Sequence, residues 1–156
     1  MTRIPALAVV ALLACWSLPG QAREYLETNE MQKARAFGAG VLAGGHHRGR
    51  QDVWLAGQTT LTDLNGKSIA GDFEAQARTV FALIGKTLER AGGKLSDLVT
   101  MTVFITDVRN GDKLVEIRRE LFPDGKFPGS ALITVTGLAR PGMLVEVQAI
   151  AVIGDK

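Results

Sequence analysis

The sequence is poor in cysteine and histidine, and each shortage removes a class of site. One cysteine, Cys15, among 156 residues excludes an internal disulfide framework and a zinc site built from cysteines. The two histidines, His46 and His47, are adjacent, so on a strand they would point to opposite faces. No acidic or histidine partner stands at metal-ligand spacing from them. We therefore place this pair in an exposed glycine-rich turn and expect no metal.

Aromatic residues and charge of one sign are also scarce. Only 6% of residues are aromatic, and 18 basic residues stand against 16 acidic ones, which gives a net charge of +2. This balance lacks the basic excess of a nucleic-acid-binding domain, so we expect no nucleic-acid partner. The glycines form neither a phosphate-binding loop nor a dinucleotide fingerprint, and we expect no cofactor. A hydrophobic share of 46% is too high for a disordered chain, and the length suits one domain.

The first 22 residues have the pattern of an export signal. Arg3 is the only charge before Arg23, and residues 4–18 are almost entirely apolar. This run falls short of the roughly 20 residues that span a bilayer. Residues 19–22 then break the helix and offer small residues before a cleavage point after Ala22. We predict a signal peptide over 1–22 and a periplasmic or secreted protein that leaves the membrane after cleavage; a lipoprotein acylated at Cys15 is the alternative.

The rest of the chain divides into an irregular polar lead-in, residues 23–35, and one domain, residues 36–153. Spacings of three and four residues predict two helices, and alternation or β-forming residues predict five strands. Asp72 and Asn110 are the expected N-caps, and Gly92-Gly93 suits the end of the first helix. The expected order is ββαβαββ, with strands over 37–42, 53–58, 98–105, 131–136 and 143–153 and helices over 72–91 and 110–122.

This order predicts an α+β fold in which two helices cover one face of a mostly antiparallel sheet. The second face also needs cover. Cleavage would leave 134 residues (156 minus 22), and no further element is available to supply that cover. Oligomerisation through the open face is the economical solution.

Glu146 is the strongest catalytic candidate on pattern alone. It stands within the last predicted strand and shares a face, by alternation, with Leu144, Gln148 and Ile150. A carboxylate in such apolar company could hold or activate a water molecule. A solvated or salt-bridged strand residue is the plainer alternative, and the pattern leaves it open.

The basic residues of the second helix have a plain interpretation as well. Lys113, Arg118 and Arg119 are interpreted as a solvated helix face and not as a nucleic-acid patch.

Several segments of the chain resemble the Rid (YjgF) family. The resemblance spans about residues 36–153 in collinear order, and several motifs occur together. It implies a chorismate-mutase-like fold and a homotrimer with a central barrel, with ligand clefts between subunits. It also implies cofactor-free hydrolysis of 2-imino or 2-aminoacrylate species to 2-keto acids and ammonia. The segments that carry it are 53–58, 73–78, 91–99, 102–107, 127–128 and 144–152.

The resemblance also assigns roles to single residues. Glu146 corresponds to the family glutamate that places water against the imine carbon, and Gly57 and Gln58 are the retained glycine-glutamine pair. The family tyrosine falls at Phe37, which keeps the ring without the hydroxyl. We therefore take Glu146 as the catalytic candidate and Phe37, Gly57, Gln58 and Ser130 as ligand-binding candidates.

Two family positions are changed in ways that affect the chemistry. The arginine that clamps the substrate carboxylate falls at Ser130, and an asparagine on the second helix falls at about Val115. A serine hydroxyl cannot replace a bidentate guanidinium, and losing such a contact costs about 1.5–3 kcal/mol. Lys126 and Arg140 are surrogate cations at other positions, and we expect neither to replace the arginine.

The sequence therefore predicts an exported Rid-family protein with altered chemistry. The first hypothesis is a deaminase-like hydrolase that uses Glu146 on an uncharged or differently anchored small molecule. The alternative is a trimer that binds a small molecule without converting it. A third hypothesis, an interaction protein that uses exposed apolar surface, has no positive support in the sequence.

Overall fold

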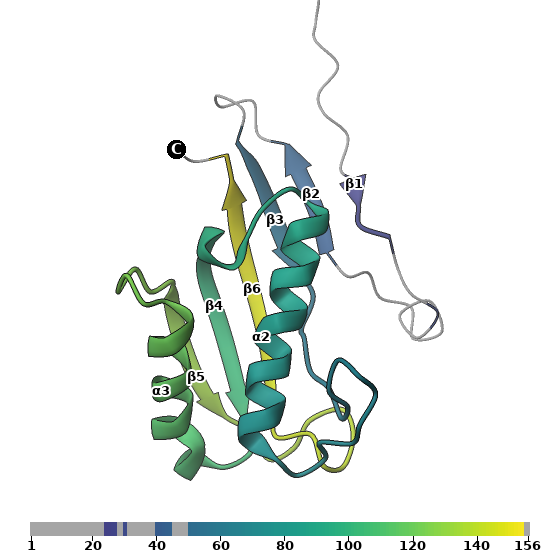
Figure 1. The fold of residues 1–156 in the computed structure, drawn as a ribbon, viewed down its shortest axis with the longest axis vertical. Helices are drawn as coiled ribbons and strands as arrows, with labels where there is room; N and C mark the ends of the chain where they lie inside the picture. The colour runs from purple at the N-terminus through teal and green to yellow at the C-terminus, as the bar shows by residue number, and fades with distance from the viewer. Residues whose placement is uncertain (1–23, 28–29, 31–39, 45–49, 155–156) are drawn as a thin grey trace, which may run out of the picture.

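The computed structural model describes residues 24–27, 30, 40–44 and 50–154 and places their elements around one mixed sheet (Figure 1). The sheet has six strands in the order β1-β2-β3-β6-β4-β5. In chain order the elements are β1 (Glu24–Tyr25), β2 (Gly40–Gly44), β3 (Gln51–Leu55), α2 (Phe73–Arg90), η1 (Leu95–Asp97), β4 (Leu98–Ile105), η2 (Val108–Asn110), α3 (Gly111–Leu121), β5 (Gly129–Thr134) and β6 (Val145–Ile153).

The sheet is antiparallel except at one edge. β4 and β5 pair in parallel, and α3 lies between them in the chain, as a parallel connection requires. The other four pairings are antiparallel. Figure 1 shows α2 lying across the sheet with α3 beside it, so both helices lie on one side. The α+β architecture predicted from the sequence is confirmed.

The first helix follows its local signals closely. Asp72 is its N-cap and accepts a hydrogen bond from the backbone N–H of Ala75 at 3.0 Å. Gly92, just beyond its end, has a φ of 79°, the left-handed conformation that glycine adopts without strain. The prediction of a helix over 72–91 thus agrees with Phe73–Arg90 to within one residue at each end.

The second helix begins differently from the prediction. Asn110 occupies the N-cap position of α3, but its backbone is helical and its side chain makes no capping bond. The chain is already turning in η2, where the Asp107 side chain accepts from the backbone N–H of Arg109 at 2.9 Å. Asp107 therefore caps the start of this helical region, one turn earlier than expected.

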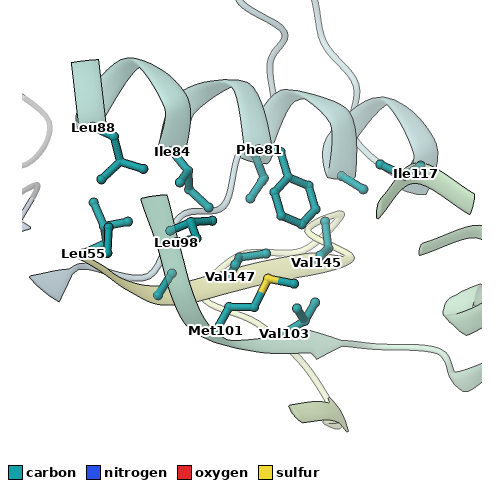
Figure 2. Close-up of a cluster of buried hydrophobic side chains, with 14 of the residues drawn as sticks. Leu55, Phe81, Ile84, Leu88, Leu98, Met101, Val103, Ile117, Val145 and Val147 are labelled. Carbon is teal, nitrogen blue, oxygen red and sulfur yellow. The ribbon is translucent and has the colours of Figure 1, made fainter. Parts of the chain in front are cut away.

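One apolar core fills the space between the helices and the sheet (Figure 2). α2 contributes the fully buried Phe81, Ile84 and Leu88, which recur at helical spacing. Figure 2 shows them opposite side chains of β4 and β6, among them Met101 and Val147. Burying each such side chain contributes about 1.5–3 kcal/mol. This core fixes the positions of the strands that carry the candidate site.

Strand ends depart from the prediction where a turn or a single bridge intervenes. β3 ends at Leu55, so Gln58 is not part of it and instead forms an isolated bridge with Val147. β6 begins at Val145 because Gly142, with a φ of 84°, still belongs to the preceding turn. β5 covers Gly129–Thr134, two residues earlier than expected at each end. Of the predicted strand over 37–42, residues 37–39 lie outside the described part.

The face of the sheet turned away from the helices carries exposed apolar side chains. Trp54 lies between the buried Val53 and Leu55 on β3 and is 44% exposed. Ile133 on β5 is 43% exposed and pairs with Phe104, which alternates with buried residues of β4. Partners in register point to the same face, so both side chains belong to this open face.

Candidate functional site

The carboxylate of Glu146 lies directly against the main chain of Gly57. Glu146 is half-buried on β6, between the fully buried Val145 and Val147, and therefore faces the open side of the sheet. A Cβ placed on Gly57 would lie 2.1 Å from Glu146 Oε1 and 3.0 Å from its Cδ. Only a residue without a side chain leaves room for the carboxylate in this position. The structure thus brings together Glu146 and Gly57, which the sequence placed 89 positions apart.

Gln58 fixes this contact by pairing with the residue next to Glu146. Its N–H donates to the Val147 carbonyl at 2.8 Å, and the Val147 N–H donates back to the Gln58 carbonyl at 2.9 Å. The hydroxyl of Thr59 donates to the Val145 carbonyl at 2.8 Å. The segment that holds Gly57 is therefore bonded to β6 on both sides of Glu146. The Gln58 amide itself donates to the Ala56 carbonyl at 3.3 Å.

A buried glutamine that the sequence analysis did not single out supports the start of β6. Gln76 on α2 is fully buried, and its amide donates to the carbonyls of Ile69 and Gly142 at 2.9 and 2.7 Å. Its Oε1 accepts from the Leu144 N–H at 2.8 Å. Leu144 precedes Glu146 by two residues, so Gln76 sets where the strand carrying Glu146 begins. The available signal was a polar residue inside an apolar helical stripe, three positions after Phe73.

Ser130 is not brought to Glu146 within one chain. It is exposed on β5 and pairs with Met101 of β4, whose partner on β6 is Ala149. Met101 is buried on the helix-covered face, so Ser130 belongs to that side of the sheet. Glu146 faces the other side and pairs with Phe104. Any site that uses both residues must therefore take them from two subunits.

The remaining predicted positions divide between exposed and undescribed ones. Phe37, the candidate for the family tyrosine position, lies outside the described residues, as do His46 and His47. Lys126 and Arg140, the two surrogate cations, are both exposed. In the ranges that the structure describes, no three histidine, cysteine, aspartate or glutamate residues are grouped as metal ligands.

One expectation about the second helix is wrong in part. Arg119 is exposed as expected, but Arg118 is half-buried, and its Nε is fully shielded and has no hydrogen-bond partner among the described residues. Burial lowers the pKa of Arg118, although a guanidinium stays charged in proteins. Helical spacing places Arg118 one position after the buried Ile117, and its long side chain lies along the protein surface instead of pointing into solvent.

No helix within the described residues is both long and apolar enough to cross a membrane. That search does not reach the first 22 residues, for which the export signal stays a prediction.

Comparison with known proteins places this fold and sequence in one family. Residues 46–153 match the family model described as endoribonuclease L-PSP. A YjgF/YER057c/UK114 family member from Mycobacterium tuberculosis is 27% identical, with 83% of this chain and 98% of that chain covered and a TM-score of 0.68. YyfA from Yersinia pestis, of the conserved Rid family, is 25% identical with 83% and 98% covered and a TM-score of 0.69. RidA from an Antarctic Psychrobacter is 29% identical with 75% and 88% covered and a TM-score of 0.64. Because the family model spans more than two thirds of the 156 residues, the protein belongs to the Rid (YjgF) family.

Proposed function

We propose that this protein is an exported Rid-type trimer whose inter-subunit clefts bind a small molecule and hydrolyse it in a deaminase-like reaction. The observation that carries the proposal is the carboxylate of Glu146, held on the open face against Gly57. A fixed, half-buried carboxylate is suited to orienting a water molecule and accepting its proton. The hydrogen bonds of Gln58 and Thr59 to β6 support this role because they hold the carboxylate in one place.

Two features support an assembly in which the cleft lies between subunits. Trp54 and Ile133 expose apolar surface on the open face, which association would bury. Ser130 and Glu146 lie on opposite sides of one sheet, so a cleft containing both takes one residue from each of two neighbours. Sedimentation analysis of the purified protein tests the assembly: a species of three chains is expected, and a monomer at micromolar concentration would contradict it.

The proposed reaction adds water across a carbon–nitrogen double bond. Water attacks the imine carbon, Glu146 accepts a proton from it, and the carbinolamine collapses to a keto group with release of ammonia. The atoms balance as imine plus water giving ketone plus ammonia. Ser130 offers a neutral hydroxyl where a cation would hold a substrate carboxylate. The proposed substrate is therefore an imine or enamine that is uncharged, or anchored by another group.

The decisive experiment compares wild type with Glu146→Gln and Ser130→Arg, each as the chain that begins at Arg23. Freshly generated 2-aminoacrylate is supplied, and 2-keto acid release is followed beside an arginine-bearing Rid protein. We expect wild type to exceed the spontaneous rate while falling at least tenfold below that control. Ser130→Arg should raise the rate by about 10–150-fold, the value of one charge-assisted contact.

The controls separate loss of chemistry from loss of fold. Glu89, exposed on α2, provides a matched Glu→Gln control that should leave turnover unchanged. Unchanged turnover in Glu146→Gln, with the rate still above background, would overturn the catalytic assignment. Because the family description names an endoribonuclease, labelled RNA is included as a further substrate, and its cleavage would contradict the expectation of no nucleic-acid partner.

A non-catalytic binding trimer is the second candidate, and Ser130 is the observation that favours it. A cleft lined by a hydroxyl and main-chain groups binds a neutral ligand through hydrogen bonds without activating it. This candidate predicts a rise in melting temperature with added ligand and no product. Conversion of that ligand, lost in Glu146→Gln, would exclude it.

The export proposal has its own test. N-terminal sequencing of the protein recovered from the periplasm or medium should begin at Arg23. Recovery of the full chain in the cytoplasmic fraction would contradict it, and a lipid-modified Cys15 would favour the lipoprotein alternative.

A further inference from the structure

A small pocket on the helix-covered side of the molecule combines two guanidinium groups with apolar side chains. It measures about 210 Å³ and is lined by Val115, Arg118, Arg119 and Phe127. Three of these residues come from α3, and Phe127 comes from the segment that leads into β5. The pocket is smaller than the roughly 300–1,000 Å³ of sites for drug-sized ligands, so it suits a compact molecule.

The cationic side of the pocket holds an unused hydrogen-bond donor. Arg118 Nε is shielded from solvent and meets no acceptor in the described part of the chain. A buried donor of this kind is unfavourable until an acceptor reaches it, and a guanidinium binds a carboxylate through two parallel hydrogen bonds. Arg119 adds a second positive charge at the rim.

The acidic residues of α3 do not neutralise this pair, because other cations already hold them. Glu120 Oε2 lies 2.6 Å from Nη1 of Arg78, and Glu116 Oε2 lies 2.6 Å from Nζ of Lys113. The pocket therefore retains the positive charge of its two arginines and favours an anion.

The other side of the pocket is apolar and fixed in place. Phe127 packs edge-on against Phe122, with ring centroids 6.3 Å apart and planes at 67°, yet it remains 47% exposed. Val115 is 39% exposed. An exposed ring held by a buried neighbour provides a preformed surface for the apolar part of a ligand.

We propose that this pocket binds a small organic carboxylate that carries a compact apolar group, such as an aromatic or branched-chain acid. The carboxylate accepts from Arg118, and from Arg119 at the rim, while the apolar group lies against Phe127 and Val115. No residue of the Glu146 site takes part, so the proposal stands whether or not the deaminase-like activity is found.

The test measures binding of benzoate and of benzamide, which has the same shape without the charge, by calorimetry on the chain that begins at Arg23. Wild type should bind benzoate at least tenfold more tightly than benzamide. Arg118→Gln should weaken benzoate binding by roughly tenfold or more, the usual loss for a charge-assisted contact. Arg118→Lys keeps the charge without the bidentate geometry and should fall between the two.

Two further variants keep the result interpretable. Val115→Trp should abolish benzoate binding by filling the pocket without changing any charge, which serves if Arg118→Gln does not fold. Glu146→Gln should bind benzoate as wild type does, which separates this site from the proposed catalytic one. Equal affinity for benzoate and benzamide, no benzoate binding at millimolar concentration, or inorganic phosphate binding as tightly as benzoate would overturn the proposal.

Discussion

Replacing Gln76 with methionine should destabilise the protein more than any surface change, because three buried hydrogen bonds depend on this side chain. Methionine matches the length of glutamine and fills the same space without an amide. The two carbonyls each keep another donor: Asp72 N–H bonds the Ile69 carbonyl at 3.1 Å, and Gly71 N–H bonds the Gly142 carbonyl at 3.0 Å. The Leu144 N–H, in contrast, loses the only acceptor that the described residues give it.

The magnitude follows from these unequal losses. Leaving one backbone N–H buried and unsatisfied costs about 1–3 kcal/mol, and each of the two other bonds contributes about 0.5–1.5 kcal/mol. The apolar methionine side chain offsets part of this through its burial. We expect a net loss of about 2–4 kcal/mol in the free energy of unfolding. At about 4 °C per kcal/mol for a domain of this size, the melting temperature falls by roughly 8–16 °C.

The assay is denaturant and thermal unfolding of wild type and Gln76→Met at one fixed protein concentration, since an oligomer's stability depends on concentration. Lys86→Met is the matched control, because Lys86 is exposed on the same helix and its change should stay within about 0.5 kcal/mol. Gln76→Glu adds a pH test: its buried carboxylate would face two carbonyl oxygens, which raises its pKa. Its stability relative to wild type should therefore improve as the pH falls and the acid becomes neutral.

One result would refute this account of Gln76. If Gln76→Met lost less than about 0.5 kcal/mol, within the range of surface changes, the three hydrogen bonds would not hold the start of β6. Wild-type-like stability of Gln76→Glu at neutral pH would contradict the buried, donor-dependent environment in the same way.

Three further substitutions test other parts of the structure. Gly57→Ala should reduce turnover or ligand binding by more than it reduces stability, because the new Cβ displaces the flexible end of Glu146; equal activity in variant and wild type would contradict the contact. Gly85→Ala, where a Cβ meets nothing within 4 Å, should instead raise the free energy of unfolding by about 0.5–1 kcal/mol through the helix propensity of alanine, and a loss would show hidden crowding. The hydrogen bonds of Arg109 lower the pKa of Asp107 from 3.8 to about 2, so the carboxylate stabilises the fold above pH 3.8 and this contribution disappears as the pH falls through 2. Asp107→Asn should accordingly melt below wild type at neutral pH and converge with it near pH 2, and a constant difference across this range would refute the assignment.

Local patterns were sufficient to predict the helices and most of the sheet. The apolar spacing from Phe73 to Leu88 and the cap at Asp72 specify α2 because helix geometry depends on residues three and four positions apart. Alternation predicted Leu98–Ile105 at its observed ends. Both signals act within one element, so the sequence contains them without knowledge of the fold.

Element ends were less predictable where a distant partner sets them. The helical region around α3 begins with the cap of Asp107 instead of Asn110, because a 3-10 turn comes first. Gln58 falls outside β3 because it bridges to Val147, and β6 begins late because the turn at Gly142 precedes it. Each correction arises from a hydrogen bond or backbone angle that the alternation of side chains does not encode.

The candidate site shows the same division. The sequence identified Glu146, Gly57 and Gln58 individually and through the family resemblance, and it showed that position 130 carries serine. Only the fold placed the Glu146 carboxylate on Gly57 and separated Ser130 onto the other side of the sheet, since strand order and register join residues far apart in the chain.

The sequence by itself determined the family, the two helices, the sheet pattern and the identity of the candidate carboxylate. The tertiary structure alone decided the roles of Gln76, which bonds to residues 66 and 68 positions away, and of Arg118, whose Nε is buried beside Phe127. The physical reason is that periodicity reports which face a residue occupies, whereas a hydrogen-bond partner or the burial of a long side chain depends on what the chain topology places opposite it.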